Sequence, residues 1–162
     1  MSKTAVLALL IALGALGLGI FQIVITLAPS EESLGIRNVW SDFHNIPETT
    51  FPTSQDILVD DLLINFTVNS GESALFLFSA QALIIHNSWL YIYFSLDGVK
   101  LAGSNYPSVQ IIDDQSNWMI PVTFYYVSNT LSPGTHNVSI IINGDNIMNE
   151  ISRCSLLVQT FV

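Results

Sequence analysis

"WLYIYFSLDG", residues 89–98, is the stretch that decides the fold of this chain. Leucine, isoleucine and phenylalanine at the even positions 90–96 alternate with tryptophan, tyrosine and serine at the odd ones, which is the period-two pattern of a half-buried β-strand. Asp97-Gly98 then supplies the chemistry of a tight hairpin turn. The stretch therefore predicts one strand followed by a hairpin.

Similar patterns extend outward from this strand in both directions. "LLINFTVN" (62–69) alternates in the same way, and "WMIPVTFYYVS" (118–128) does so with a proline that suggests an edge strand or a bulge. "ALFLFSAQALIIH" (74–86) predicts two segments or one bent strand, and "HNVSIII" (136–142) and "SLLVQTFV" (155–162) complete the series. We count about eight strands and no amphipathic helix after residue 30.

This pattern predicts an all-β fold in which two sheets pack face to face, because each strand offers one apolar face and no helix is present to cover it. A β-barrel is a second architecture that such strands can form. We favour a jelly-roll-like sandwich. An immunoglobulin-like sandwich is the alternative, although its Cys…Trp…Cys signature is missing.

The N-terminal segment "AVLALLIALGALGLGIFQIVITLA" (5–28) carries no charged side chain. As a helix it would extend about 36 Å, which is enough to cross a hydrocarbon core of about 30 Å. We therefore expect a retained transmembrane helix. A cleaved export signal is a second interpretation, since Thr26-Leu27-Ala28 loosely fits a cleavage site. A helix that packs in the core of a pilus-like filament is a third.

These patterns divide the chain into an anchor helix at 1–30, a linker and domain entry at 31–55, and a β-sandwich domain at 56–162. Within the linker we expect folded structure to begin near Asn38. Lys3 precedes the anchor and Glu31 and Glu32 follow it, so the positive-inside tendency places the N-terminus in the cytoplasm. The predicted location is the cell membrane, with a single span and an extracellular C-terminal domain.

Composition limits the partners of that domain. The chain has 4 Lys and Arg against 13 Asp and Glu, a formal net charge of −9, which argues against nucleic acid and against an anionic lipid face. Neutral, cationic or protein partners remain. Cys154 is the only cysteine, so no intramolecular disulfide can form, and its apolar surroundings in sequence indicate a buried thiol.

No catalytic or metal-binding pattern is present in the sequence. The three histidines, His44, His86 and His136, lack companions at ligand spacing, and no G-x-S-x-G stretch occurs. Asp113-Asp114 opens a loop with several oxygen ligands that could hold Ca²⁺, but its spacing matches no EF-hand or repeat loop, and we favour a solvated acidic turn. We predict no enzyme activity, no cofactor and no metal site.

The last third of the chain carries a turn and strand, "LSPGTHNV" (131–138), that leads through a polar hairpin to a final "LLV" strand, with "LDG" (96–98) upstream. In these motifs the chain resembles the C1q/TNF-like jelly-roll domains of phage, bacterial and archaeal surface proteins. The resemblance implies a domain displayed at a surface as a trimer, and it implies no ligand.

Aromatic side chains exceed what one small core readily absorbs, and we expect some of them at an interface. Small residues four apart in the anchor would also allow close helix packing. We therefore predict a membrane-anchored, self-associating surface protein for binding or adhesion, held in lipid by its helix, with a surface protein or glycan as partner. A filament-forming subunit is the alternative. The predicted interface residues are Trp89, Tyr91, Tyr93, Trp118 and Tyr126, and the sequons predict glycosylation at Asn65 and Asn137.

Overall fold

The computed structural model describes residues 35–162 except 46, 51–54, 60 and 114–116. All the regular elements in these residues are β-strands. Eight of them are five or more residues long, in agreement with the count expected from the sequence. The strands are β1 (Ile36–His44), β2 (Glu48–Thr49), β3 (Ile57–Leu58), β4 (Ile64–Val68), β5 (Ser73–Ile84), β6 (Ser88–Leu96), β7 (Val99–Lys100), β8 (Ser108–Asp113), β9 (Trp118–Ser128), β10 (Gly134–Gly144) and β11 (Glu150–Phe161).

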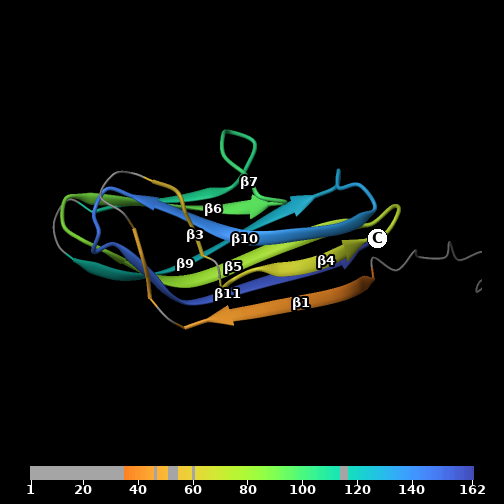
Figure 1. Ribbon diagram of the computed structural model, residues 1–162, viewed down its shortest axis with the longest axis horizontal. Coiled ribbons are helices and arrows are strands. Elements are labelled where there is room, and N and C mark those ends of the chain that lie inside the picture. The colour runs from red at the N-terminus through yellow and green to blue at the C-terminus, as the bar shows by residue number, and fades with distance from the viewer. Residues whose placement is uncertain (1–34, 46, 51–54, 60, 114–116) are drawn as a thin grey trace, which may run out of the picture. The chain divides into compact units, whose positions relative to one another are not determined.

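The strands form two antiparallel sheets that pack as a sandwich (Figure 1). The first sheet has the order β1-β11-β5-β9, with β2 also paired to β11. The second has the order β3-β10-β6-β7, with β4 paired to β10 and β8 to β6. The chain passes from one sheet to the other between β5 and β6 and between β8 and β9. It does so again between β9 and β10 and between β10 and β11. This strand order fits a jelly roll.

The core lies between the two sheets and is built from the faces that the alternating patterns predicted. In β4 the residues Ile64, Phe66 and Val68 are buried while Asn65 and Thr67 are exposed. Phe66, Phe76 and Phe94 meet across the sandwich, with ring centroids 5.5 Å apart for the first pair and 6.0 Å for the second. Period-two burial therefore determines which side of each strand enters the core.

The three features expected of particular strands are present. Asp97 and Gly98 both have positive φ angles and join β6 to β7 as a two-residue hairpin in which Leu96 pairs with Val99. β5 is one continuous strand of 12 residues. β9, which contains Pro121, lies at the edge of its sheet.

The N-terminal boundary of the sandwich lies within the stretch interpreted as linker and domain entry. β1 pairs along most of its length with β11, from Ile36 opposite Phe161 to His44 opposite Cys154. Residues 35–162 form one compact unit. β1 is an edge strand whose residues are largely exposed, so it tolerates charged side chains such as Arg37 and Asp42. These charges interrupt the apolar–polar alternation by which the other strands were predicted.

The predicted anchor helix at residues 5–28 lies outside the described residues. Among residues that the structure does describe, no helix is long and apolar enough to cross a membrane.

Candidate binding surface

The two ends of the sandwich are formed by different segments of the chain. The chain enters at Gly35, and Ile36 pairs with Phe161, which in turn pairs with Ser73 at the start of β5. The opposite end, where Ile84 of β5 pairs with Trp118 of β9, is named here the distal end. Its described connections are β5–β6 (85–87) and β10–β11 (145–149), together with Asn117 just before β9, and they lie on the left in Figure 1.

Asn149 holds two of these connections together. Its side chain is completely buried, and its Oδ1 accepts hydrogen bonds from the Ile85 amide at 3.0 Å and from the Ser88 hydroxyl at 2.8 Å. Its Nδ2 donates to the Trp89 carbonyl at 2.8 Å. One buried amide thus satisfies three groups of the β5–β6 region from within the β10–β11 connection, which fixes the two relative to each other.

Two further hydrogen bonds complete the framework of the distal end. Asn117 Oδ1 accepts a hydrogen bond from the His86 amide at 3.0 Å, which links the residue before β9 to the β5–β6 connection. Asp145 Oδ1 accepts from the Trp89 amide at 2.8 Å. The distal end is therefore a set of hydrogen-bonded turns, with β5–β6 in the middle.

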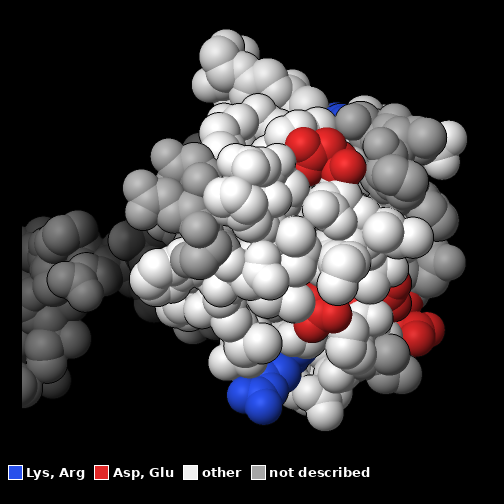
Figure 2. Space-filling model, turned by 90° about the vertical axis from the view of Figure 1, so that its left-hand side faces the viewer, with Lys and Arg blue, Asp and Glu red and all other residues white. Residues whose placement is uncertain are grey.

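Large apolar side chains project from the β10–β11 connection and from the ends of β8 and β9 at this end of the sandwich. Each is more than half exposed, and Figure 2 shows that uncharged atoms make up most of this face, with isolated acidic groups and a basic side chain at its lower edge. Exposed apolar groups that gather in one region mark interaction sites more often than scattered ones do. The members of this apolar set are Ile112 (65% exposed), Trp118 (57%), Met119 (58%), Ile147 (57%) and Met148 (62%).

A small apolar hollow of about 230 Å³ lies beside Trp118. Isoleucines from β5, β8 and β9 line it together with the indole: Ile84, Ile111, Ile112 and Ile120. The described residues that line the hollow are all apolar or aromatic, so it can accept an apolar side chain.

The predicted interface residues divide into separate groups in the structure. Trp89, Tyr91 and Tyr93 form one row on the outer face of β6, half-buried, with ring centroids 5.2 Å and 5.8 Å apart. Lys100 Nζ lies 4.6 Å from the centroid of the Tyr93 ring and forms an ion pair with Asp56 at 2.7 Å. One ring of the row is therefore already occupied by a cation from the same chain.

Trp118 and Tyr126 do not lie together. Trp118 is at the distal end, whereas Tyr126 lies further along β9, where its ring stacks on Phe76 with centroids 6.0 Å apart. Tyr106 covers another side of the Tyr126 ring at 5.7 Å. Tyr126 is thus half-buried against the core, and Trp118 is the most exposed of the five.

Both predicted glycosylation sites lie on the outer face of the second sheet. Asn65 in β4 and Asn137 in β10 are directly opposite each other across the strand pair. Asn65 is exposed, and Asn137 is half-buried with its backbone amide bonded to Asp97 at 2.9 Å. Neither belongs to the distal end.

The described titratable groups form neither a metal-binding cluster nor an activated thiol. No group of three or more His, Cys, Asp or Glu residues that could hold a metal occurs among the described residues. Of the proposed calcium loop, Asp114 lies outside them. Burial raises the pKa of the Cys154 thiol to about 12, which makes it a poor nucleophile.

His136 is held between two acceptors near the other end of the sandwich. Its Nδ1 lies 2.7 Å from Asp97 Oδ2 and its Nε2 lies 2.8 Å from the Ser132 carbonyl oxygen. Hydrogen bonding to Asp97 raises the pKa of His136. This pair links the "LDG" turn to the "LSPGTH" turn, which agrees with a structural role for the histidine.

Sequence reasoning did not identify Ile112, Met119, Ile147 or Met148 as surface residues. Ile147-Met148 is an apolar pair inside an otherwise polar connection, and that contrast was the available signal. Met119 lies at an odd position of the alternating stretch 118–128. That position predicts an exposed side chain, but it does not indicate which residues lie beside it.

Comparisons with known proteins give no family. No family model matches the chain, and no curated protein matches it in sequence. Among solved structures it is similar to VP2 of infectious bursal disease virus, Gx strain (9% identity, TM-score 0.46, covering 75% of this chain and 32% of that one). It is also similar to a CBM36-1 domain of a multidomain xylanase from a termite hindgut metagenome, Trinervitermes trinervoides (7% identity, TM-score 0.41, covering 75% and 96%). The chain spans about a third of the length of the viral proteins, and at these TM-scores the likenesses carry no functional argument.

Proposed function

We propose that this chain is a non-enzymatic surface protein, in which the N-terminal apolar segment anchors a jelly-roll domain in the membrane and the domain binds a protein partner through its distal end. The observation that carries the proposal is the set of five large apolar side chains, each more than half exposed, at the end opposite the point where the chain enters the sandwich.

The exposure of this apolar set and the net charge of the chain favour a protein partner. Exposing five such side chains to water is unfavourable unless a partner covers them part of the time. A partner that covers this end must offer an apolar surface, and a protein surface does so more readily than a polar glycan. With a net charge of −9 on the chain, neutral or cationic protein surfaces fit best.

The entry point supports the same geometry. The described part of the chain begins at Gly35, and Ile36 at the start of β1 pairs with Phe161, so the distal end lies at the opposite end of the strands from the point where the chain enters the sandwich.

Site-specific photo-crosslinking on intact cells tests the binding proposal. A photoreactive residue in place of Met148 in the full chain should give one discrete adduct that excess unlabelled full-length protein displaces. The same probe at Val39, which is 52% exposed at the entry end, is the matched control and should give none. Trp118→Ser should abolish the Met148 adduct without changing thermal unfolding, because the indole is already exposed. Equal adducts at both positions, or none at Met148, would contradict the proposal.

Detergent extraction separates the anchored protein from the filament-forming alternative. An anchored protein should be released from washed membranes by mild detergent as a small discrete particle. Filaments that sediment after the lipid has been removed would instead identify the N-terminal segment as an assembly helix.

A further inference from the structure

β9 leaves one long side of the first sheet open. Among the described residues it pairs only with β5, so its other edge has no strand beside it. An unpaired strand edge presents backbone N–H and C=O groups that a second strand can satisfy. The question is whether this edge is protected against such pairing.

The two edge strands of this sheet differ in protection. β1 contains Arg37 and Asp42, charges of the kind that discourage edge pairing. β9 has 11 residues and contains no Asp, Glu, Lys or Arg. Its one protective feature is Pro121, which lies near the distal end of the strand.

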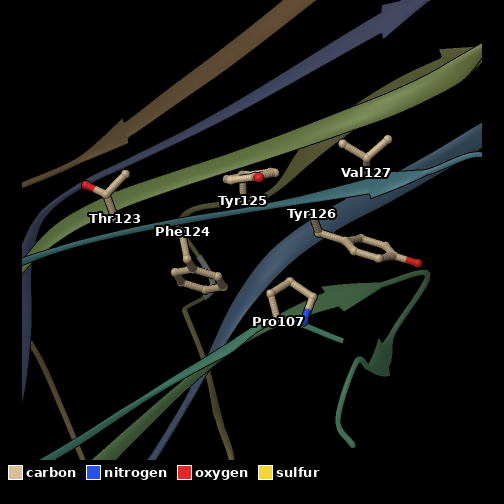
Figure 3. Close-up of a pocket in the computed structure, with 6 residues that line it drawn as sticks. All are labelled: Pro107, Thr123, Phe124, Tyr125, Tyr126 and Val127. Atoms are coloured by element: carbon tan, nitrogen blue, oxygen red, sulfur yellow. The ribbon is translucent and has the colours of Figure 1, made fainter. Parts of the chain in front are cut away.

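An open pocket of about 510 Å³ follows the same edge (Figure 3). It is lined by Pro107 and by five consecutive residues, Thr123–Val127. Figure 3 shows Thr123, Tyr125 and Val127 on one side of the strand and Phe124 on the other. Because consecutive residues face opposite sides of a sheet, a pocket that touches five in a row must run along the edge between them.

Pro121 indicates which backbone groups point outward. A proline within a strand is tolerated where its nitrogen faces the open edge, since it has no N–H to donate to the neighbouring strand. Backbone groups two residues apart point the same way in an antiparallel pair. Thr123, Tyr125 and Val127 therefore direct their N–H and C=O groups to the open edge.

We propose that this edge pairs with β9 of a second copy of the chain, antiparallel and across a two-fold axis at Tyr125. In this register Thr123 of each copy is opposite Val127 of the other, and the two Tyr125 rings are opposite each other. Both are favourable cross-strand pairs. A register centred on Thr123 would oppose Tyr125 to Pro121 and lose a donor, so the Tyr125 register is preferred.

The self-complementary Tyr125 register favours a second copy as the occupant, and the charge distribution permits it. Each chain has a net charge of −9, so two copies repel wherever their acidic surfaces meet. The uncharged β9 edge is a place where they can approach and gain backbone hydrogen bonds without opposing like charges. The pair is two-fold, in contrast to the trimer that the family resemblance implies, and its antiparallel geometry points the two distal ends, and likewise the two Gly35 entry points, in opposite directions. Copies anchored side by side in one membrane would not pair in this way, so the pair joins copies whose N-terminal segments leave at opposite ends.

Disulfide trapping tests the pairing and its register in the full chain, in detergent with micelles in excess over protein. Tyr125→Cys should form a disulfide-linked dimer on mild oxidation, because residues opposite each other in such a pair have Cα atoms about 5.5 Å apart, within disulfide range. Val39→Cys, on the other edge strand and similarly exposed, is the matched control and should remain monomeric. The native Cys154 is buried and adds no background.

Two further variants make the test decisive. Thr123→Cys should cross-link at least tenfold less than Tyr125→Cys, since its partner in the proposed register is Val127. Tyr125→Lys places like charges opposite each other and should shift the mass in solution to the monomer, whereas Val39→Lys should not. Circular dichroism should confirm unchanged β content in every variant. Equal cross-linking at positions 125 and 39, no cross-linking at 125, or an unchanged mass in Tyr125→Lys would overturn the proposal.

Discussion

Asn149 shows how much of the distal end depends on one side chain. It is completely buried. Its Oδ1 accepts hydrogen bonds from the Ile85 amide and the Ser88 hydroxyl, and its Nδ2 donates one to the Trp89 carbonyl. No isosteric apolar residue can replace these bonds, because the backbone groups at Ile85 and Trp89 would remain buried without partners.

We therefore expect Asn149→Ala to lower the free energy of unfolding by about 3 kcal/mol, the cost of leaving two or three buried polar groups unsatisfied. Asn38→Ala, at an exposed position, is the control and should change stability by less than about 0.5 kcal/mol. Denaturant unfolding followed by tryptophan fluorescence measures both. Equal effects would show that the connections are held by other contacts.

The contact between His136 and Asp97 makes part of the stability depend on pH. Both ring nitrogens of His136 face acceptors, so only the doubly protonated ring donates to both. Hydrogen bonding to Asp97 raises the pKa of His136 above its ordinary value of 6.5. Although partial burial raises the pKa of Asp97, bonds from His136 and the Asn137 amide lower it overall below 3.8.

The stability from His136 should be fully present below pH 6.5 and should be lost as the pH rises through the raised folded-state pKa. The contribution of Asp97 should be present above pH 3.8 and should be lost as the pH falls through its lowered pKa. NMR titration of the His136 ring measures the first effect directly. Asp97→Asn should move that midpoint to lower pH, and His86→Gln, at an exposed position, should leave it in place. An unchanged midpoint in Asp97→Asn would refute the coupling.

At the scale of the element, β5 is the central strand of its sheet, between β11 and β9, and its buried face carries Phe76 and Phe78. Phe76 contacts Phe66 and Phe94 of the second sheet and Tyr126 of β9. One side chain on this strand therefore joins the two layers.

Phe76→Ala should reduce the free energy of unfolding by about 4 kcal/mol, through lost burial and the cavity that remains. Phe43→Ala makes the same chemical change on β1 of the same sheet, where the ring is 62% exposed, and should cost less than about 1 kcal/mol. Thermal unfolding of the two variants under one condition gives the comparison. Similar losses would place the Phe43 ring in an interface that the isolated chain does not show.

At the scale of the whole molecule, we predict the orientation of the proposed membrane protein from its charges. Lys3 lies on one side of the apolar segment in the sequence, and Glu31 and Glu32 lie on the other. The positive-inside tendency then predicts a sandwich outside the cell.

A tag after Val162 should be removed by protease on intact cells, whereas a tag before Met1 should be removed only after lysis. The N-terminal tag is the internal control for membrane integrity. Protection of the C-terminal tag until lysis would reverse the orientation and would place the distal end inside the cell.

The sequence by itself determined the strands and their buried faces, because alternation is a local property: each strand must place every second side chain in the core, as in β4 and β6. It also indicated the β6–β7 turn and the edge position of β9, since Asp-Gly and proline act on their own backbone. β1 was less visible, because an edge strand with one exposed face tolerates charge.

Only the tertiary structure decided which residues share a surface. The apolar set of the distal end comes from the β10–β11 connection and from the ends of β8 and β9, between Ile112 and Met148, and it is assembled because the strands of a jelly roll cross between two sheets. The open edge of β9 likewise exists because no later strand returns beside it. Such adjacency depends on pairing between distant segments, and a local pattern contains no information about which strand becomes the neighbour of another.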